Sequence, residues 1–219
     1  MFPLDTLDFA NHRAEQLRQF LHKEGKDISP QNLALKLYDH DSGIAFGYWE
    51  AVQQGIWFRY PHEIQSQAEC GEQAVYRYAV AKALGLKPRI FLLEGIRDVG
   101  WLYPGPSSHL TVDVAVDDER IAVDPHFSLY GPAELSATGI RLKQNTVSDL
   151  HPEKNPLRRR LGIKAESLVQ LSEADLIEQI RDLRKPKGLL KMLQAYPMLG
   201  QEAAYEGDGI FPSLTSDVV

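Results

Sequence analysis

The sequence predicts an α+β protein in which a helix headed by the chain's single cysteine packs on an antiparallel sheet. Helical patterns occupy the first third of the chain, and the last of the early helices carries the cysteine. Two alternating strand patterns, separated by a short polar turn, follow in the middle, and helical patterns return near residue 172. Because helices and strands are segregated along the chain, the α+β class is favoured.

The N-terminal segment predicts two helices. Residues 6–24 carry an apolar stripe at three- and four-residue steps, which is typical of an amphipathic helix. The stripe consists of Ala10, Ala14, Leu17 and Leu21. Thr6 is a candidate N-cap and Gly25 a candidate stop, and a second short helix is expected to begin near Ser29-Pro30.

The middle of the chain predicts the helix, strand and hairpin that would build a site. The helix that follows Cys70 has an apolar face and ends at Gly85, and the run RIFLLEG over 89–95 reads as a strand. The runs HLTVDVAV and RIAVDP then alternate on either side of Asp117-Asp118, which indicates a hairpin with a two-residue turn.

We expect three regions along the chain. Residues 1–135 would form the core with its N-terminal helices. Residues 136–200 would form a helical C-terminal extension packing on that core, with its clearest helical pattern at 172–195, and residues 201–219 a flexible tail.

Composition and charge exclude several functions. The 219 residues are 43% hydrophobic and 25% charged, which is ordinary for a globular protein. A net charge of -6 argues against nucleic acid as a partner, because such binding needs a basic face. The apolar runs are far shorter than the roughly 18 residues of a membrane span, and the N-terminus does not have the pattern of a signal peptide. With one cysteine and no internal disulfide, we expect a cytoplasmic protein.

Resident cofactors are not expected. His62, His126 and His151 do not have the spacing of metal ligands, and the sequence holds no glycine-rich phosphate loop. The chemistry would therefore rest on side chains alone.

Cys70 stands where a polar run gives way to a helical pattern. If the helix begins at Glu69 or Cys70, its dipole would lower the pKa of the thiol and the Cys70 N–H would be free to bind an oxyanion. Alternatively, Ser66 and Glu69 form a capping box that places Cys70 a full turn inside the helix. Glu69 and Glu72 oppose thiolate formation, and a lone cysteine can also be a buried small hydrophobe.

The hairpin offers a histidine partner. With the two-residue turn, Val116 pairs with Glu119 and Thr111 stands opposite Asp124. Asp124 then shares a face with His109, one diagonal step away, where the two side chains can meet. A three-residue turn would send Asp124 to the other face. The first register keeps the valines on one side and predicts an imidazole held by a carboxylate, with its other nitrogen toward the thiol.

These stretches together resemble the transglutaminase-like superfamily, relatives of the papain-type cysteine peptidases. The matching motifs are AECGEQA at the cysteine, ALGLKPRI, SHLTVDVAV and RIAVDP, in that order over about residues 64–126. The chain differs from the family at Leu110, where an aromatic residue is common, and at Glu69, where a small or neutral residue is frequent.

The resemblance implies a papain-like fold and a Cys70-His109-Asp124 triad. Cys70 would attack an amide or peptide carbonyl of a peptide or protein substrate, and the thioester would pass to water or to an amine. By analogy with the family, Gln65 or Gln67 would supply a second oxyanion donor, although an ordinary loop residue is the favoured interpretation for each. The alternative is an inactive scaffold of the same fold that binds a protein, an interpretation for which Glu69 and Glu72 beside the thiol and the aromatic region at 46–60 leave room. The sequence does not specify the oligomeric state.

Overall fold

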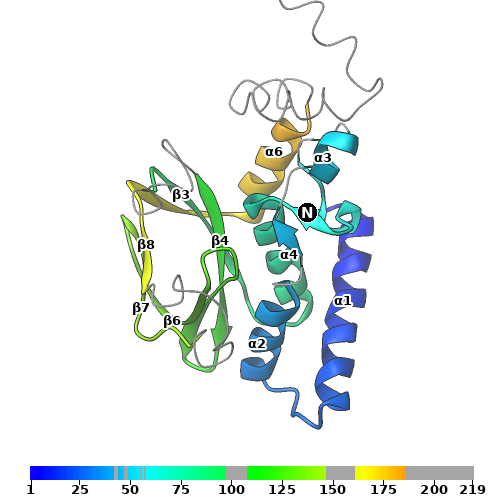
Figure 1. The fold of residues 1–219 in the computed structure, drawn as a ribbon, viewed down its shortest axis with the longest axis vertical. Coiled ribbons are helices and arrows are strands. Elements are labelled where there is room, and N and C mark those ends of the chain that lie inside the picture. Colours follow the sequence, from blue (N-terminus) through cyan, green and yellow to red (C-terminus); the bar gives the residue numbers. More distant parts are fainter. Residues whose placement is uncertain are drawn as a thin grey trace, which may run out of the picture.

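The computed structural model describes residues 1–41, 44–46, 49–54, 56, 58–96, 108–146 and 161–185. It confirms the predicted α+β class: a seven-stranded antiparallel sheet is covered on one face by helices, and the helix that begins at Cys70 packs on it (Figure 1).

The first two helices form largely where the sequence predicts them. Helix α1 spans Leu4–Lys23 and α2 spans Pro30–Asp41. All four residues of the predicted stripe on α1 are buried. The predicted cap at Thr6 is wrong, because the helix begins earlier, after Pro3, and Thr6 is instead a buried helical residue whose Oγ1 lies 3.1 Å from His62 Nδ1. Gly25 follows the helix end with φ +67°, a conformation that glycine adopts without strain.

Short elements connect α2 to the cysteine helix. They are β1 (Ala45–Phe46), α3 (Trp49–Gln54), the 3-10 helix η1 (Pro61–Glu63) and β2 (Gln67–Ala68). Strands β1 and β2 pair in parallel, which fixes the segment immediately before Cys70. Of the aromatic region at 46–60, Phe58 is buried and Tyr60 packs against the core. The side chains of Phe46, Tyr48, Trp49 and Trp57 lie outside the described residues.

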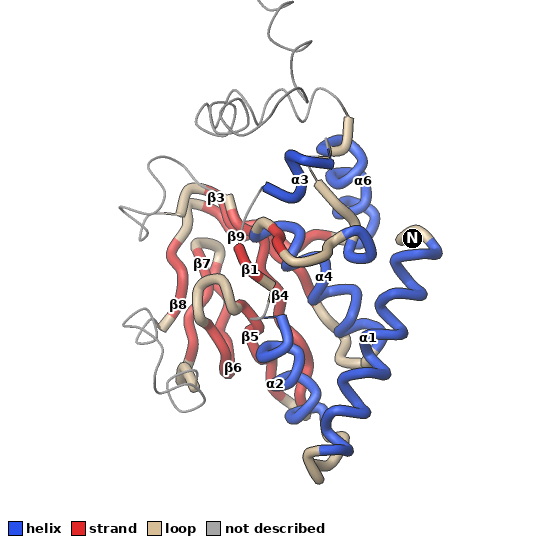
Figure 2. The backbone as a smooth tube through the Cα atoms, turned by 45° about the vertical axis from the view of Figure 1, so that its right-hand side comes forward, coloured by secondary structure: helices blue, strands red, loops and turns tan. Residues whose placement is uncertain are grey.

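The main sheet has the order β8-β7-β6-β5-β4-β3-β9 (Figure 2). Its strands are β3 (Arg89–Glu94), β4 (His109–Val116), β5 (Glu119–Asp124), β6 (Leu129–Ser136), β7 (Gly139–Leu142), β8 (Gly162–Lys164) and β9 (Ser167–Leu171). Neighbours follow the chain from β3 to β8, and β9 then returns to pair with β3. The β4–β5 hairpin therefore lies inside the sheet, where most of its side chains are buried.

The region after residue 135 differs from the expected helical extension. Residues 139–171 contribute β7, β8 and β9 to the same sheet that carries the hairpin. These strands have three to five residues, too few for a period to stand out in a charged sequence. The predicted helix at 172–195 is present as α6, Glu173–Leu183, capped by Ser172, whose side chain accepts a hydrogen bond from the Asp175 N–H. Residues 186–219, including the expected tail, lie outside the described part.

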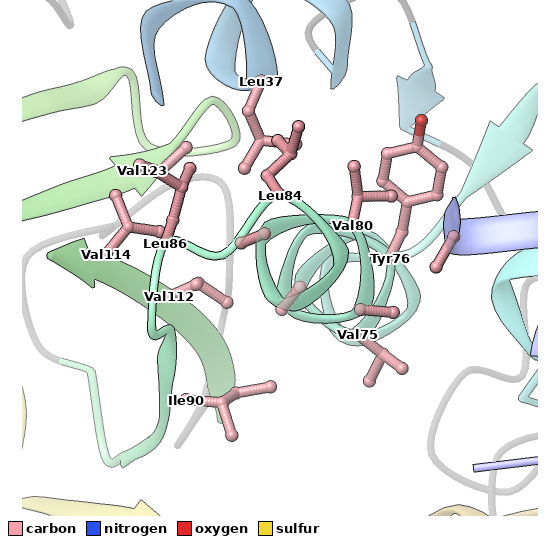
Figure 3. Close-up of a cluster of buried hydrophobic side chains, with 14 of the residues drawn as sticks. Leu37, Val75, Tyr76, Val80, Leu84, Leu86, Ile90, Val112, Val114 and Val123 are labelled. Atoms are coloured by element: carbon pink, nitrogen blue, oxygen red, sulfur yellow. The ribbon is translucent and has the colours of Figure 1, made fainter. Parts of the chain in front are cut away.

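Helix α4 (Cys70–Ala83) lies between the sheet and α1 (Figure 1). It is buried on nearly all sides because it is covered from both directions. Figure 3 shows the strand residues Val112, Val114 and Val123 on one side of the helix and its own Val75 and Val80 on the opposite side, all within one core cluster. A second cluster, which includes Leu93, Ala122, Phe127 and Leu129, is separate from this one.

Strand β4 of the hairpin and helix α4 lie side by side, so that their ends can be compared. The Ala115 N–H donates to the Leu86 carbonyl at 2.8 Å, so the segment that leaves α4 lies beside the end of β4. Since β4 runs from His109 to Val116, its first residue lies toward the other end of α4, where Cys70 begins the helix. The fold thus places the start of α4, the start of β4 and the end of β5 in one region.

Candidate active site

Cys70 is the first residue of α4, so the later of the two predicted helix starts is confirmed. Glu69 is the N-cap, and the first helical hydrogen bond runs from the Gln73 N–H to the Glu69 carbonyl at 2.9 Å. Ser66 therefore does not cap the helix. The Cys70 N–H is therefore one of the first N–H groups of the helix, for which the helix itself offers no carbonyl partner. The thiol is only partly buried.

The thiol contacts the residue that precedes it. Cys70 Sγ donates to Glu69 Oε2 at 3.8 Å, and the Glu69 N–H donates to Glu72 Oε2 at 3.1 Å. Burial, and next the charge of Glu72, raise the pKa of Glu69 to about 8. The carboxyl group beside the thiol is consequently mostly protonated at neutral pH.

The expected lowering of the thiol pKa is wrong. Burial contributes most to raising the pKa of Cys70 well above its ordinary value, followed by the charges of Glu69 and Asp124. A backbone N–H bond from Gly71 acts in the opposite direction and does not outweigh them. The resting thiol is therefore neutral.

The predicted hairpin register is confirmed. Val116 pairs with Glu119 and Val112 with Val123, and Asp117 in the turn has φ +50°, which Asp tolerates better than most residues. His109 Nε2 lies 2.7 Å from Asp124 Oδ2. The diagonal contact predicted from the alternation is thus present.

Asp124 is held from two directions. Its Oδ2 faces His109, and its Oδ1 accepts a hydrogen bond from the Phe127 N–H at 3.1 Å. Burial would raise the pKa of this fully buried carboxyl group, but the charge and hydrogen bond of His109, with Arg77 and His126, hold it well below its ordinary range. Because an ionised carboxylate only accepts, Nε2 of His109 carries the hydrogen.

The other ring nitrogen of His109 is unpaired. Among the described residues, Nδ1 has no hydrogen-bond partner although His109 is only 3% exposed. In a neutral ring with hydrogen on Nε2, Nδ1 is a proton acceptor. Thr111 Oγ1, two residues along β4, is a second buried polar atom without a partner in the described part of the chain.

The thiol and the imidazole approach the site from different directions. The even-numbered residues of β4 belong to the same core cluster as α4. The His109 ring instead lies 4.5 Å from the ring of Phe127, which belongs to the second cluster. No hydrogen bond joins Sγ to Nδ1 within the described residues. The two groups are connected electrostatically through Asp124, whose charge raises the pKa of Cys70 and which interacts directly with His109.

Two further basic residues surround the His109–Asp124 pair. His126 stacks on His109 with ring centroids 5.3 Å apart, and burial, then the charge of His109, lower the pKa of His126 to about 4. Arg77, fully buried on α4, donates to the Val123 carbonyl at 3.3 Å and to Gln73 Oε1 at 3.2 Å. Burial lowers the pKa of Arg77 to about 10, where it stays charged and helps keep Asp124 ionised.

A buried ion pair supports the start of α4. The side chains of Arg59 and Glu72 are both fully buried, with Arg59 Nη2 2.8 Å from Glu72 Oε2 and Arg59 Nε 2.9 Å from Glu72 Oε1. Arg59 also lies 2.8 Å from Glu50 Oε2 through Nη1. Glu72, which the sequence suggests as an opponent of the thiolate, therefore has its charge compensated by Arg59.

The glutamines proposed as oxyanion donors have their backbone fixed by this network. The N–H groups of Gln65 and Gln67 donate to Glu50 at 3.1 and 3.0 Å, and the Gln67 carbonyl accepts from Arg59 at 2.6 Å. Gln65 is exposed and Gln67 is partly buried. Among the described residues, no hydrogen bond joins either side chain to Cys70, so the structure brings their backbone near the helix start and leaves their proposed role a prediction.

Sequence reasoning missed Arg59 and Arg77. Arg77 has a detectable signal, because it lies two helical turns after Cys70 and is a charged residue on the same face as Ala74, Val80 and Ala81. Arg59 stands in an aromatic-rich stretch without a clear period, and nothing local predicts its partner thirteen residues later.

No family model, curated protein or solved structure matches this chain. Within the described residues, no helix is both long and apolar enough to cross a bilayer. The same residues contain no group of three or more His, Cys, Asp or Glu side chains arranged to hold a metal ion.

Proposed function

We propose that this protein is a thiol enzyme that acts on an amide or peptide acyl bond through Cys70, His109 and Asp124. The observation that carries the proposal is the buried 2.7 Å contact between His109 and Asp124, in the region where α4 begins with the chain's single cysteine. A carboxylate that fixes one ring nitrogen and leaves the other free is the arrangement that a general base requires.

The raised pKa of the thiol favours a general-base mechanism over a resting ion pair. As Cys70 Sγ attacks the carbonyl carbon, its proton would pass to Nδ1 of His109, and the resulting imidazolium would be stabilised by Asp124. The proton would then go to the leaving amine as the tetrahedral intermediate collapses to a thioester. Water, activated by the same ring, would release the acid and regenerate the thiol.

The start of α4 would supply the oxyanion site. The Cys70 N–H is at the first helical position, and such groups stabilise negative charge that develops in a transition state. Sγ and Nδ1 must approach each other on substrate binding, as catalytic hydrogen bonds commonly tighten only in the complex.

A papain-like, transglutaminase-like core is the fold that we propose for residues 64–126. A cysteine-headed helix packed on an antiparallel sheet, with His and Asp on adjacent strands, supports it together with the motifs of the sequence. The proposed substrate is a peptide or protein. Water is the more general acceptor, with acyl transfer to an amine as the other route. The chain's single free cysteine fits the cytoplasm.

An inactive protein-binding scaffold is the second candidate. The observation that favours it is the neutral thiol, whose pKa is raised by burial, Glu69 and Asp124, and which lacks a hydrogen bond to His109. In that case the His109–Asp124 contact would be a structural remnant.

Acyl transfer to Cys70 separates the two candidates. The probe is p-nitrophenyl acetate, because attack by Sγ releases p-nitrophenolate and leaves an acetyl thioester that mass spectrometry locates. We expect wild-type protein to be acylated faster than a denatured control, His109→Asn to lose that advantage, and Cys70→Ala to abolish labelling. Equal acylation of wild-type and His109→Asn proteins would refute the enzyme and favour the scaffold.

A further inference from the structure

The Glu69 carboxyl group covers the start of α4. Its Oε2 accepts the Sγ–H bond of Cys70 at 3.8 Å. Its Oε1 lies over Gly71, where an added Cβ would come within 2.5 Å of it. Glycine at position 71 therefore lets this carboxyl group fold back onto the first turn, directly beside the reactive sulfur.

The charges around this contact come from several parts of the fold. Helix α4 contributes Glu72, whose charge is paired with Arg59 from the segment before η1. The hairpin contributes Asp124, which is paired with His109. Helix α3 contributes Glu50, which shares Arg59 with Glu72, and among the described contacts neither Arg59 nor His109 is bonded to the Glu69 carboxyl group.

We propose that Glu69 is a further catalytic residue of this site, which permits a Cys70 thiolate while its carboxyl group is protonated and suppresses it once that group ionises. This inference rests on the proposed function, because it explains how a partly buried thiol next to two acids could still react. It makes Glu69 a part of the chemistry in addition to a helix cap.

The proton balance is simple. With Glu69 in its acid form, the Sγ proton moves to His109 Nδ1, leaving a thiolate and an imidazolium, while the Glu69 O–H is retained and can donate to the sulfur. With Glu69 ionised, the same transfer would create two adjacent negative charges in a buried site, which is unfavourable. Burial raises the pKa of Glu69 to about 8, so the acid form is the one present at neutral pH.

The test compares alkylation of Cys70 by iodoacetamide in wild-type and Glu69→Gln proteins as the pH is raised. Because the chain has one cysteine, all labelling reports this thiol. We expect the ratio of the two rates to be near one at about pH 6 and to rise above about pH 8 to roughly tenfold, the effect of one pKa unit on the thiolate fraction. A ratio that stays flat, or a slower Glu69→Gln protein, would overturn the proposal.

A second pair of variants separates charge from helix capping. Asp and Asn are both good N-caps and differ in little except charge. We expect Glu69→Asn to react faster than Glu69→Asp above about pH 8, although both begin the helix equally well. Glu15→Gln, at an exposed position on α1, controls for the change in net charge and should leave the ratio to wild type flat.

The two proposals fail independently. Alkylation needs no carbonyl substrate, whereas the proposed function is tested by the dependence of acylation on His109. A flat alkylation ratio with His109-dependent acylation refutes the role of Glu69 alone. A rising ratio with acylation that is independent of His109 refutes the enzyme and shows that Glu69 controls the thiol without catalysis.

Discussion

The two sides of the candidate site treat buried charge in opposite ways. On the hairpin side, Asp124 is fully buried, yet His109, Arg77 and His126 hold its pKa below the ordinary range. On the helix side, the pKa values of both Glu69 and Cys70 are raised, with burial as the largest cause. One side therefore keeps a permanent ion, and the other keeps two neutral acids.

In the proposed enzyme, this difference would assign separate roles in catalysis to the two sides. An ionised carboxylate fixes the imidazole before any substrate arrives, which gives an oriented base. A neutral thiol next to a neutral carboxyl group avoids a buried anion at rest and becomes charged only when a proton can leave. Arg59 maintains the contrast, because it neutralises Glu72 and prevents a further uncompensated charge at the helix start.

The largest effect is expected on replacing Asp124 by Asn. The amide preserves shape but cannot stabilise the imidazolium, and the equivalent change in another triad lowers turnover about 10⁴-fold. We expect acylation of Cys70 by p-nitrophenyl acetate to fall to the rate of the His109→Asn protein. Asp124 also stabilises the fold above its ordinary pKa and loses this effect as pH falls, so the variant should show a weaker loss of stability in acid.

Asp113→Asn is the matched control for this change. Asp113 lies on β4, the strand that pairs with the β5 strand of Asp124, and it is also buried, but its carboxylate is bound by Arg89 and Arg120 instead of by a histidine. We expect it to lose stability and to keep the acylation rate per folded molecule. If both variants lose acylation alike, Asp124 acts only through the fold.

The hairpin side could be predicted from the sequence because its geometry is local. The valines and the Asp117-Asp118 turn determine the register, and the register determines that Asp124 meets His109. The start of α4 at Cys70 was one of two local alternatives, and the sequence could not choose between them. The choice depends on how β2 and the Arg59–Glu72 pair fix the preceding segment.

The pKa of Cys70 could not be predicted for a related reason. A dipole at a helix start is visible in the sequence, whereas the burial that raises the pKa of the thiol is a property of the folded chain. The strands after residue 135 were missed because their pairing partners, not their own short sequences, define them.

Replacing Arg59 tests how much the Arg59–Glu72 pair contributes to the stability of the helix side of the site. Arg59→Met leaves Glu72 buried without its partner, and removal of one member of such a pair commonly costs about 3–5 kcal/mol of unfolding free energy. We expect a clear fall in the denaturation midpoint and a slower alkylation of Cys70, since an uncompensated anion would then lie two residues from the thiol in the first turn of α4.

Two controls define that effect. Arg18→Met breaks an exposed pair with Glu15 and should cost about 0–1 kcal/mol. The double change of Arg59→Met with Glu72→Leu removes both charges and should recover part of the lost stability. If Arg59→Met is no worse than Arg18→Met, the ion pair does not support the start of α4.

The smallest effect is expected at His126, on the hairpin side. Burial and the charge of His109 lower the pKa of His126 to about 4 in the folded protein, against an ordinary value of 6.5. Between these values the unfolded chain binds more protons, so His126 makes stability fall as the pH drops from about 6.5 to about 4. His126→Phe keeps the ring against His109 and cannot titrate, so its melting temperature should change less over this range than that of wild type.

His126→Asn should show the same flatter profile with a lower melting temperature throughout, because it also loses the aromatic contacts, worth about 0.5–1.5 kcal/mol. If the melting temperature of both variants fell with pH as steeply as that of wild type, the acid sensitivity of the hairpin side would come from Asp124 alone. The balance of charges around His109 would then depend on Arg77 and not on His126.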